Sequence, residues 1–161
     1  MCGGKNRPDR YREIRNRKVS HNYFVGDTYE AGIILRGAEV KSIREGKAQI
    51  NEAFARVDRG TVRLYQAHID EYRFETDSIH DPKRSRKLLL HKKEIQRLQA
   101  TINAGGQTLI PLRLYFKGCR VKVEIALCKG KKNFDKRQAL KKKTELNEAR
   151  RATQASLRDK R

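Results

Sequence analysis

The sequence predicts a mainly β (α+β) fold, an OB-like antiparallel β-barrel with flanking helices and a disordered basic C-terminal tail. Two observations predict it. Short segments in which apolar and polar residues alternate recur through the middle of the chain, and segments with helical spacing interrupt them. Five or six antiparallel strands in about 110 residues suit a small barrel, closed or partly open, and the OB fold is one barrel of this kind.

The chain should begin its ordered part with a long, bent strand over residues 19–35. Aromatic and β-branched side chains dominate this stretch, and Gly26 with Asp27 interrupts it. A short helix should follow over residues 38–44, with Gly46 as its stop. The residues at helical spacing in it are Val40, Ile43 and Arg44.

A hairpin is expected next. Residues 53–58 and 62–65 alternate in polarity, and Arg59-Gly60 between them is suited to a tight turn. Residues 68–85 lack periodicity, so they predict no regular element.

A second helix is expected from Asp81-Pro82 to about Ala104. Asp can cap a helix and Pro can occupy its first turn, while Gly105-Gly106 would end it. The residues of its apolar stripe are Leu88, Ile95, Leu98 and Ile102.

The clearest alternation lies in residues 112–127, on either side of Gly118, and it predicts a second hairpin with one core face and one mostly basic face. The core face would hold Leu112, Leu114, Phe116, Val121, Val123, Ile125 and Leu127. The other face would hold Arg113, Tyr115, Lys117, Arg120, Lys122, Glu124 and Ala126.

Charge divides the chain into three parts. The net charge is +20, from 39 Lys and Arg against 19 Asp and Glu, so a polyanionic partner is implied. Residues 1–18 should be a flexible basic arm, residues 19–130 the barrel, and residues 131–161 a basic tail. The tail has good helix formers but a weak apolar stripe, so it should be disordered alone and ordered on a partner.

Several function classes find little support. Cys2, Cys119 and Cys128 form no CxxC pair, which favours free thiols in a reducing compartment such as the cytoplasm. No run of about 18 apolar residues supports membrane insertion. The histidine spacing matches no zinc site, and no nucleophile elbow or phosphate-binding glycine loop is present, so no cofactor, metal or catalytic residue is predicted.

An enzymatic function has less support from the sequence than a binding function. Glu30 with Glu39, or Asp70 with Glu71, could do acid–base work, but exposed or salt-bridged carboxylates are the commoner case in a cationic protein. Two alternative functions stay open. One is a nuclease or RNA-modifying enzyme, and the other is a structural ribosomal or nucleoid protein.

Interleaved cations and rings favour RNA binding. Arg63 with Tyr65, and Arg113 with Tyr115 and Lys117, can present charge and aromatic surface on one solvent face, where phosphates and bases could meet them. The same alternation is found in any half-exposed strand, so a purely structural reading of each strand stays open.

Several ordered strings resemble the small protein B (SmpB) family, the partner of transfer-messenger RNA in bacterial ribosome rescue. The similarity covers residues 16 to about 151 and leaves residues 1–15 outside. The strings are Asn16-Arg17-Lys18 with His21, Tyr29 to Gly32, Glu39 to Ala48, Asp81-Pro82, Arg86 to Leu90, Gly130-Lys131-Lys132 and Asp135-Lys136-Arg137.

The resemblance implies an OB-like barrel that grips the tRNA-like domain of transfer-messenger RNA (SsrA RNA) and enters stalled ribosomes for trans-translation. It implies the ribosome and its small-subunit rRNA as partners, and elongation factor Tu and alanyl-tRNA synthetase through the RNA, with no membrane partner. By position, the RNA contacts would be Asn16, Arg17, His21, Glu30, Leu89 and Lys122. A role of Leu89 in a helix core is the alternative for that residue.

The resemblance also gives the tail a role. It implies that the tail occupies the decoding centre and the empty mRNA channel, and is helical on the ribosome from about Asp135. The residues at the decoding centre would be Gly130, Lys131, Lys132, Phe134, Asp135, Lys136 and Arg137. Phe134 stands where other members can carry His, so its ring could stack on a base but could not carry a proton.

Overall fold

The computed structural model describes residues 11, 13–73, 81–132, 135, 144, 147 and 148. The chain forms two compact units, residues 1–129 and residues 130–161. The elements are β1 (Ile14–Arg15), α1 (Val19–Asn22), β2 (Tyr23–Ile33), α2 (Gly37–Arg44), β3 (Ala48–Gln49), β4 (Phe54–Asp58), β5 (Thr61–Tyr65), β6 (His68–Ile69), β7 (Arg86–Leu89), α3 (Lys92–Asn103), β8 (Gln107–Lys117) and β9 (Arg120–Gly130).

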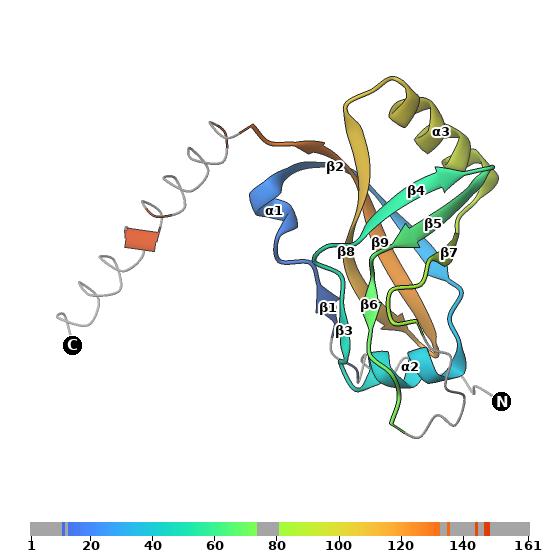
Figure 1. Cartoon of the computed structure of the whole chain (residues 1–161). Coiled ribbons are helices and arrows are strands. Elements are labelled where there is room, and N and C mark those ends of the chain that lie inside the picture. Colours follow the sequence, from blue (N-terminus) through green and yellow to red (C-terminus); the bar gives the residue numbers. More distant parts are fainter. Residues whose placement is uncertain are drawn as a thin grey trace. The chain divides into compact units, whose positions relative to one another are not determined.

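The strands of the first unit close into a ring (Figure 1). Their order in the main sheet is β1-β8-β4-β5-β7-β2-β9, and β9 pairs again with β8, so the described strands from β8 round to β9 form a barrel with β1 as an extra edge strand. β3 and β6 form a separate two-stranded sheet. The predicted mainly β, OB-like antiparallel barrel with flanking helices is confirmed.

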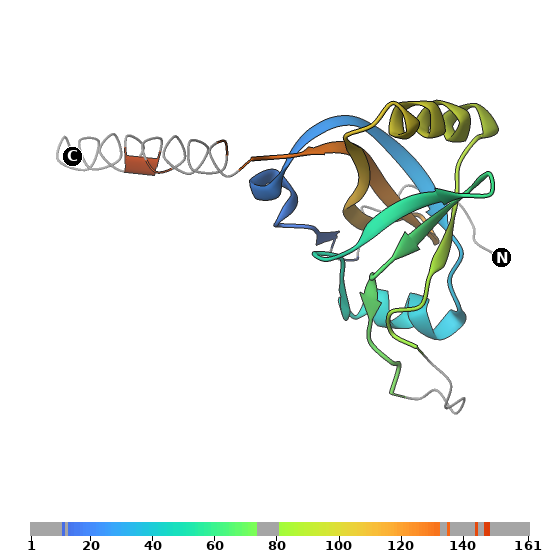
Figure 2. The same cartoon turned by 45° about the horizontal axis from the view of Figure 1, so that its top comes forward.

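The barrel interior is apolar, and a helix lies across each end. Figures 1 and 2 show α2 at one end of the barrel and α3 at the other. Ile43 of α2 and Leu98 of α3 are both buried in the same cluster as the strand side chains, so the helices seal the ends of the core. The strand residues of this cluster include Ala55, Val62, Leu64, Leu88, Leu109, Leu114, Phe116, Val121, Val123, Ile125 and Leu127.

The two predicted hairpins and the first predicted helix are confirmed. β4 and β5 pair in register across a turn in which Arg59 (φ 45°) and Gly60 (φ 72°) are both left-handed, as a two-residue hairpin requires. β8 and β9 pair across Gly118, which also has positive φ. Residues 37–44 form α2.

One residue of the predicted core face of β8 is placed wrongly by the sequence. The register between β8 and β9 shifts between Pro111 and Arg113, because Pro cannot donate a ladder hydrogen bond and is tolerated at a bulge. Leu109 before the shift and Leu114 after it both face the barrel, so Leu112 falls on the outside. It packs there on a second apolar cluster that contains Val19, Ile110, Ala126 and Cys128.

The prediction of a helix from Asp81-Pro82 onward is wrong for its first half. Asp81 forms a turn, in which its carbonyl accepts from Arg84 N (3.2 Å) and its carboxylate from Lys83 N (2.9 Å). Residues 86–89 are a strand that pairs with β5 and β2. The helix begins only after His91, whose amide donates to Glu94 Oε2 (2.9 Å).

Two predictions near the N-terminus also need correction. Residues 19–22 form the short helix α1, where Asn22 N donates to Lys18 O (3.1 Å), instead of the start of the long strand. Residues 14–18, expected in the flexible arm, are fixed on the barrel because β1 pairs with β8 and Asn16 N donates to Leu112 O (2.8 Å). Residues 1–10 and 12 of the expected arm lie outside the described residues.

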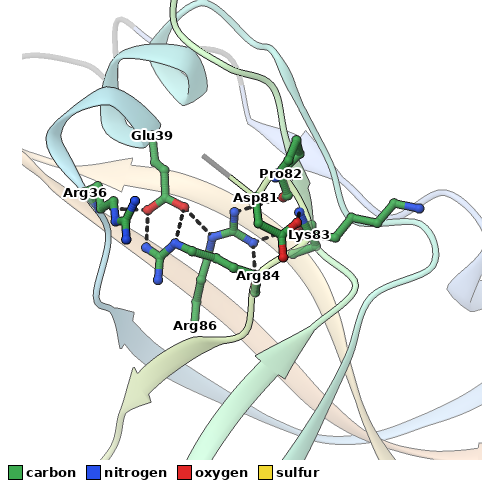
Figure 3. A network of polar contacts seen from close by, with 8 residues as sticks. Arg36, Glu39, Asp81, Pro82, Lys83, Arg84 and Arg86 are labelled. Carbon is green, nitrogen blue, oxygen red and sulfur yellow. Dashed lines mark hydrogen bonds and ion pairs between the residues drawn. The ribbon is translucent and has the colours of Figure 1, made fainter. Parts of the chain in front are cut away.

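A buried ion-pair network joins α2 to β7 (Figure 3). Glu39 and Arg86 are fully buried, and Arg86 Nε lies 2.8 Å from Glu39 Oε1. Arg84 binds both carboxylate oxygens, and Arg36 N donates to Glu39 Oε2 (2.7 Å), which caps the first turn of α2. Arg86 also donates to three backbone carbonyls, those of Ala67, Pro82 and Arg84. Every charge in this network therefore has polar partners.

The pKa of Glu39 reflects both its burial and its polar partners. Burial alone would raise it, but the hydrogen bonds from Arg84 and the Arg36 amide, with the charge of Arg86, hold it below its usual value of 4.5. A carboxyl whose pKa is lowered in the folded state contributes stability above its unfolded pKa. That stability is lost as pH falls below about 4.5.

Glu39→Gln should destabilise the protein by about 3–5 kcal/mol at neutral pH, because it leaves the Arg86 guanidinium buried without its counter-ion. Urea unfolding measures this change, and the variant should also lose part of the wild-type acid sensitivity. The matched control is Glu45→Gln, which breaks the half-exposed Lys47–Glu45 pair and should cost less than about 1 kcal/mol. Equal small losses in both variants would contradict a structural role of the network.

Candidate nucleic-acid interface

A cluster around Glu30 lies on the outer face of the barrel. Glu30 of β2 accepts hydrogen bonds from the Tyr115 hydroxyl and from Lys117 Nζ (3.1 and 3.2 Å), both on β8. Lys122 Nζ of β9 lies 3.4 Å from Glu30 Oε1. Two residues predicted as RNA contacts, Glu30 and Lys122, are therefore brought together by the closure of the barrel.

The cluster fixes the charge states of its members. The Tyr115 hydroxyl, followed by Lys117, lowers the pKa of Glu30 to about 2, so this carboxylate is ionised at every physiological pH. Burial, together with the hydrogen bond to Glu30, raises the pKa of Tyr115 to about 12, so its hydroxyl remains a donor. The site presents a carboxylate, a phenol and two ammonium groups.

The basic face of β8 is less available than its sequence pattern indicates. Arg113 Nη1 pairs with Glu13 (3.0 Å) and its Nε with Glu124, while its guanidinium lies 4.8 Å from the centre of the Tyr115 ring. The sequence pattern predicted that these cations face solvent and are available to phosphates. This must be corrected for Arg113, because acidic residues of β9 and of the segment before β1 neutralise it.

Leu89 lies beside this cluster, exposed on the barrel. β7 places Arg86 and Leu88 inside, so Leu89 points outward and is 52% exposed. Gly32 of β2 pairs with it, and a Cβ at Gly32 would lie only 3.3 Å from Leu89 Cβ. Leu89 and Lys122 line one groove of about 340 Å³. The alternative of a helix-core role for Leu89 is wrong.

Asn16 has a structural position. Its Nδ2 donates to Ile50 O (2.9 Å) and Pro111 O (3.2 Å), and its Oδ1 accepts from Lys18 N (3.1 Å). The side-chain amide thus joins the segment after β1 to the β3–β4 loop and to the bulge of β8. Arg17 N donates to Asn51 Oδ1 (3.2 Å), which holds the same turn.

Arg17 and His21 lie on the surface around α1. Both are exposed, and His21 Nδ1 lies 3.0 Å from Asn22 Oδ1. The predicted RNA contacts therefore form two groups in the structure. One group, on β2, β7 and β9, is Glu30, Leu89 and Lys122, and the other, around α1, is Asn16, Arg17 and His21.

The family model described as "SmpB protein" matches residues 13–155. The chain belongs to the SmpB family.

Similar curated proteins agree with the family match. The "SsrA-binding protein" of Nocardia farcinica is 55% identical over 129 residues, which cover 80% of this chain and 81% of the relative. That of Halothermothrix orenii is 50% identical over 138 residues, 86% of this chain and 89% of the relative. A chain of the solved structure "tmRNA-SmpB: a journey to the center of the bacterial ribosome" is similar with a TM-score of 0.64 and 41% identity, covering 80% of this chain and 94% of that chain.

The tail residues singled out in this SmpB-family chain are described only in part. Gly130 ends β9, and Asp135 is helical, with its Oδ2 accepting from Lys132 N (3.2 Å). Phe134, Lys136 and Arg137 lie outside the described residues.

The remaining candidates are placed apart. Glu39 is in the buried network and Glu30 on the surface, so they do not form a carboxylate pair, while Asp70 binds His68 Nε2 (2.9 Å). Burial raises the pKa of the Cys128 thiol to about 11. No group of three or more potential metal ligands occurs among the described residues, and no helix in that part is long and apolar enough to cross a membrane.

Sequence reasoning missed the partners of Glu30. Tyr115 was noticed for its alternation with basic residues, but it lies 85 residues from Glu30 in the chain. The available signal was the alternation that puts Arg113, Tyr115 and Lys117 on the solvent-facing side of their strand. That alternation shows the face on which Tyr115 lies, but it does not show which strand lies beside it.

Tyr115→Phe should raise the pKa of Glu30 from about 2 toward its usual 4.5, because it removes the hydrogen bond that lowers this pKa most. NMR titration of the Glu30 carboxyl carbon between pH 1.5 and 6 measures the change. The control is Tyr65→Phe, since the Tyr65 ring stacks on Phe54 and makes no contact with Glu30. A titration of Glu30 in Tyr115→Phe that matches wild type would refute this cause.

Proposed function

We propose that this protein binds the tRNA-like domain of transfer-messenger RNA and delivers it to stalled ribosomes for trans-translation. Membership of the SmpB family, the printed name of its relatives and the tmRNA-SmpB structure support this function. The observation in the molecule that carries it is the Glu30 cluster, which joins two lysines, a phenol and an ionised carboxylate beside the exposed Leu89.

Each group in the cluster has a use toward RNA. The ionised Glu30 carboxylate can accept from a base N–H or a ribose 2′-hydroxyl. Lys117 and Lys122 together carry one more positive charge than Glu30 can balance, so a phosphate can bind them without displacing the carboxylate. Leu89 offers apolar surface to an unstacked base or a sugar. Such a mixed surface suits looped RNA better than a regular duplex, whose bases are hidden in the stack.

Arg17 and His21 extend this proposed contact around α1, and Asn16 holds the turn that carries Arg17. The whole-chain charge of +20 adds sequence-independent attraction for phosphates. Through the RNA, elongation factor Tu and alanyl-tRNA synthetase would act on the same complex. We propose the bacterial cytoplasm as the compartment in which the protein acts.

For the tail we propose the second half of the activity. Residues 131–161 would be disordered alone and fold on the ribosome, from about Asp135, in the decoding centre and the empty mRNA channel. The basic, weakly apolar composition supports coupled folding, because rRNA phosphates would neutralise the charge. The residues at the decoding centre would be Gly130, Lys131, Lys132, Phe134, Asp135, Lys136 and Arg137.

Lys122→Ala should weaken binding to the tRNA-like domain by roughly tenfold and reduce the steepness of its salt dependence by about one phosphate contact. Competition binding at near-physiological salt, against ordinary tRNA and random duplex RNA, measures both effects. Lys47→Ala is the matched control, because Lys47 is a surface lysine paired with Glu45 away from the cluster. Equal binding of the wild type to all three RNAs would instead indicate a generic basic RNA-binding protein.

Deletion of residues 131–161 should leave affinity for the tRNA-like domain within about threefold, since few of the proposed contacts lie there and each lost phosphate contact has a modest effect. The same deletion should abolish peptide tagging on stalled ribosomes in a reconstituted translation assay. A control chain that keeps the tail but carries Lys122→Ala should lose more of its affinity for the tRNA-like domain than of its tagging activity. Parallel loss of both activities on deletion would contradict separate roles for barrel and tail.

A further inference from the structure

A second cavity lies on the other group of predicted contacts, away from the Glu30 cluster. It has a volume of about 360 Å³, within the size range of small-molecule sites. α1, the start of β2, the β3–β4 loop and the start of β8 surround it. Its lining residues are Asn16, Lys18, Val19, Asn22, Tyr23, Asn51, Glu52, Ala53, Phe54, Thr108 and Ile110.

The lining combines aromatic surface with amides. Tyr23 and Phe54 are both partly exposed at the edge of the second apolar cluster, and Phe54 is held by parallel stacking on Tyr65, with ring centroids 5.5 Å apart. Asn22 and Asn51 supply side-chain amides, whose nitrogens donate no hydrogen bond to any residue that the structure describes. Rings that can stack and amides with unused donors are the groups that read a single planar base.

Basic residues lie at one side of the cavity, in and before α1. Lys18 and Arg17 are exposed on one side, and His21 follows on α1. Glu52 balances one of these charges through its pair with Lys18. A base in the cavity would leave its phosphate on the side where these basic residues lie.

We propose that this cavity receives one nucleobase extruded from an RNA strand, with a flanking phosphate bound by the basic residues at one side of it. The proposal rests on the proposed function, since it gives a second RNA contact to the same protein. The base comes from the tRNA-like domain or from ribosomal RNA, which share this chemistry.

The two hydrogen bonds that Asn16 donates give it a defined part in this site. Asn16 fixes the segment after β1 against the β3–β4 loop and β8, the elements that surround the cavity. It is a positioning residue, and its loss should disturb base binding through the shape of the cavity.

The test uses the full chain and two tryptophan variants. Asn51→Trp fills the cavity, and Asn103→Trp places the same ring on the exposed last turn of α3 as a matched control. The probes are the four nucleoside 5′-monophosphates and inorganic phosphate, each titrated against 15N-labelled protein by NMR. Asn22→Ala, which removes one amide of the lining, provides a second variant if Asn51→Trp does not fold.

We expect the monophosphates, and not inorganic phosphate, to shift the amide signals of Asn51 and Thr108 in wild type and in Asn103→Trp. Asn51→Trp, in which only the Thr108 signal can be compared with wild type, should lose the Thr108 shift, and Asn22→Ala should weaken both shifts. Absent shifts at these residues, or equal shifts with inorganic phosphate, would overturn the proposal.

Binding to RNA then identifies the source of the base. Asn51→Trp should bind either the tRNA-like domain or the small ribosomal subunit at least about fivefold more weakly than Asn103→Trp, the loss expected of one stacked base. Weaker binding to the tRNA-like domain assigns the base to that domain, and weaker binding to the small ribosomal subunit assigns it to ribosomal RNA. If Asn51→Trp binds both the tRNA-like domain and the small subunit with unchanged affinity, the proposal of a base in the cavity is overturned. If Asn103→Trp still prefers the tRNA-like domain in that experiment, the proposed function stands. A control without that preference would refute the proposed function instead.

Discussion

The buried pair between Glu39 and Arg86 is the interaction on which the arrangement of the barrel and of its proposed RNA-binding surface depends. Removing two charges from water is expensive, and the cost is met only when both ions are paired and their remaining polar atoms are hydrogen-bonded. Here the guanidinium of Arg86 reaches the carbonyls of Ala67, Pro82 and Arg84 as well as Glu39, so one side chain ties α2, the connection between β5 and β6, and the turn before β7 together.

This pair also determines which side chains β7 presents. Side chains alternate along a strand, so burial of Arg86 requires Leu88 to be buried and Leu89 to be exposed. Leu89 then lies beside Gly32, in the groove with Lys122. A shift of β7 by one residue would bury Leu89 and bring Arg86 to the surface, which would remove the proposed apolar RNA contact and break the ion pair together. The position of the interface is thus coupled to the stability of the core.

The sequence predicted those parts of the fold that depend on local pattern. The hairpin at Arg59-Gly60, the helix α2 and the β8–β9 pair follow from periodicity and turn residues alone. The failures have non-local causes. Residues 86–89 contain basic and leucine residues that suit a helix, but pairing with β5 and β2, and an ion pair to a residue 47 positions away, make them a strand.

The candidate site shows the same limit. Spacing could not show that Glu30 meets Tyr115, or that a bulge at Pro111 turns Leu112 outward, because both follow from pairing between distant strands. The family resemblance supplied the RNA-contact residues together, without separating their roles. The geometry separates them: Glu30 is an ion on an exposed surface, whereas the amide of Asn16 is already used within the protein.

That separation changes how a loss of RNA affinity should be interpreted at each position. Glu30 keeps lone pairs and a permanent charge at the surface, so a substitution there removes a group that RNA itself can contact. Asn16 can donate a hydrogen bond to RNA only by giving up one that it makes to Ile50 or Pro111, and an exchange of this kind yields little net free energy. A loss at Asn16 therefore reports the shape of the loops around the cavity. In the proposed mode of binding, the two groups of predicted contacts would bind RNA by different means, one through its own exposed atoms and the other through a cavity whose walls Asn16 holds in place.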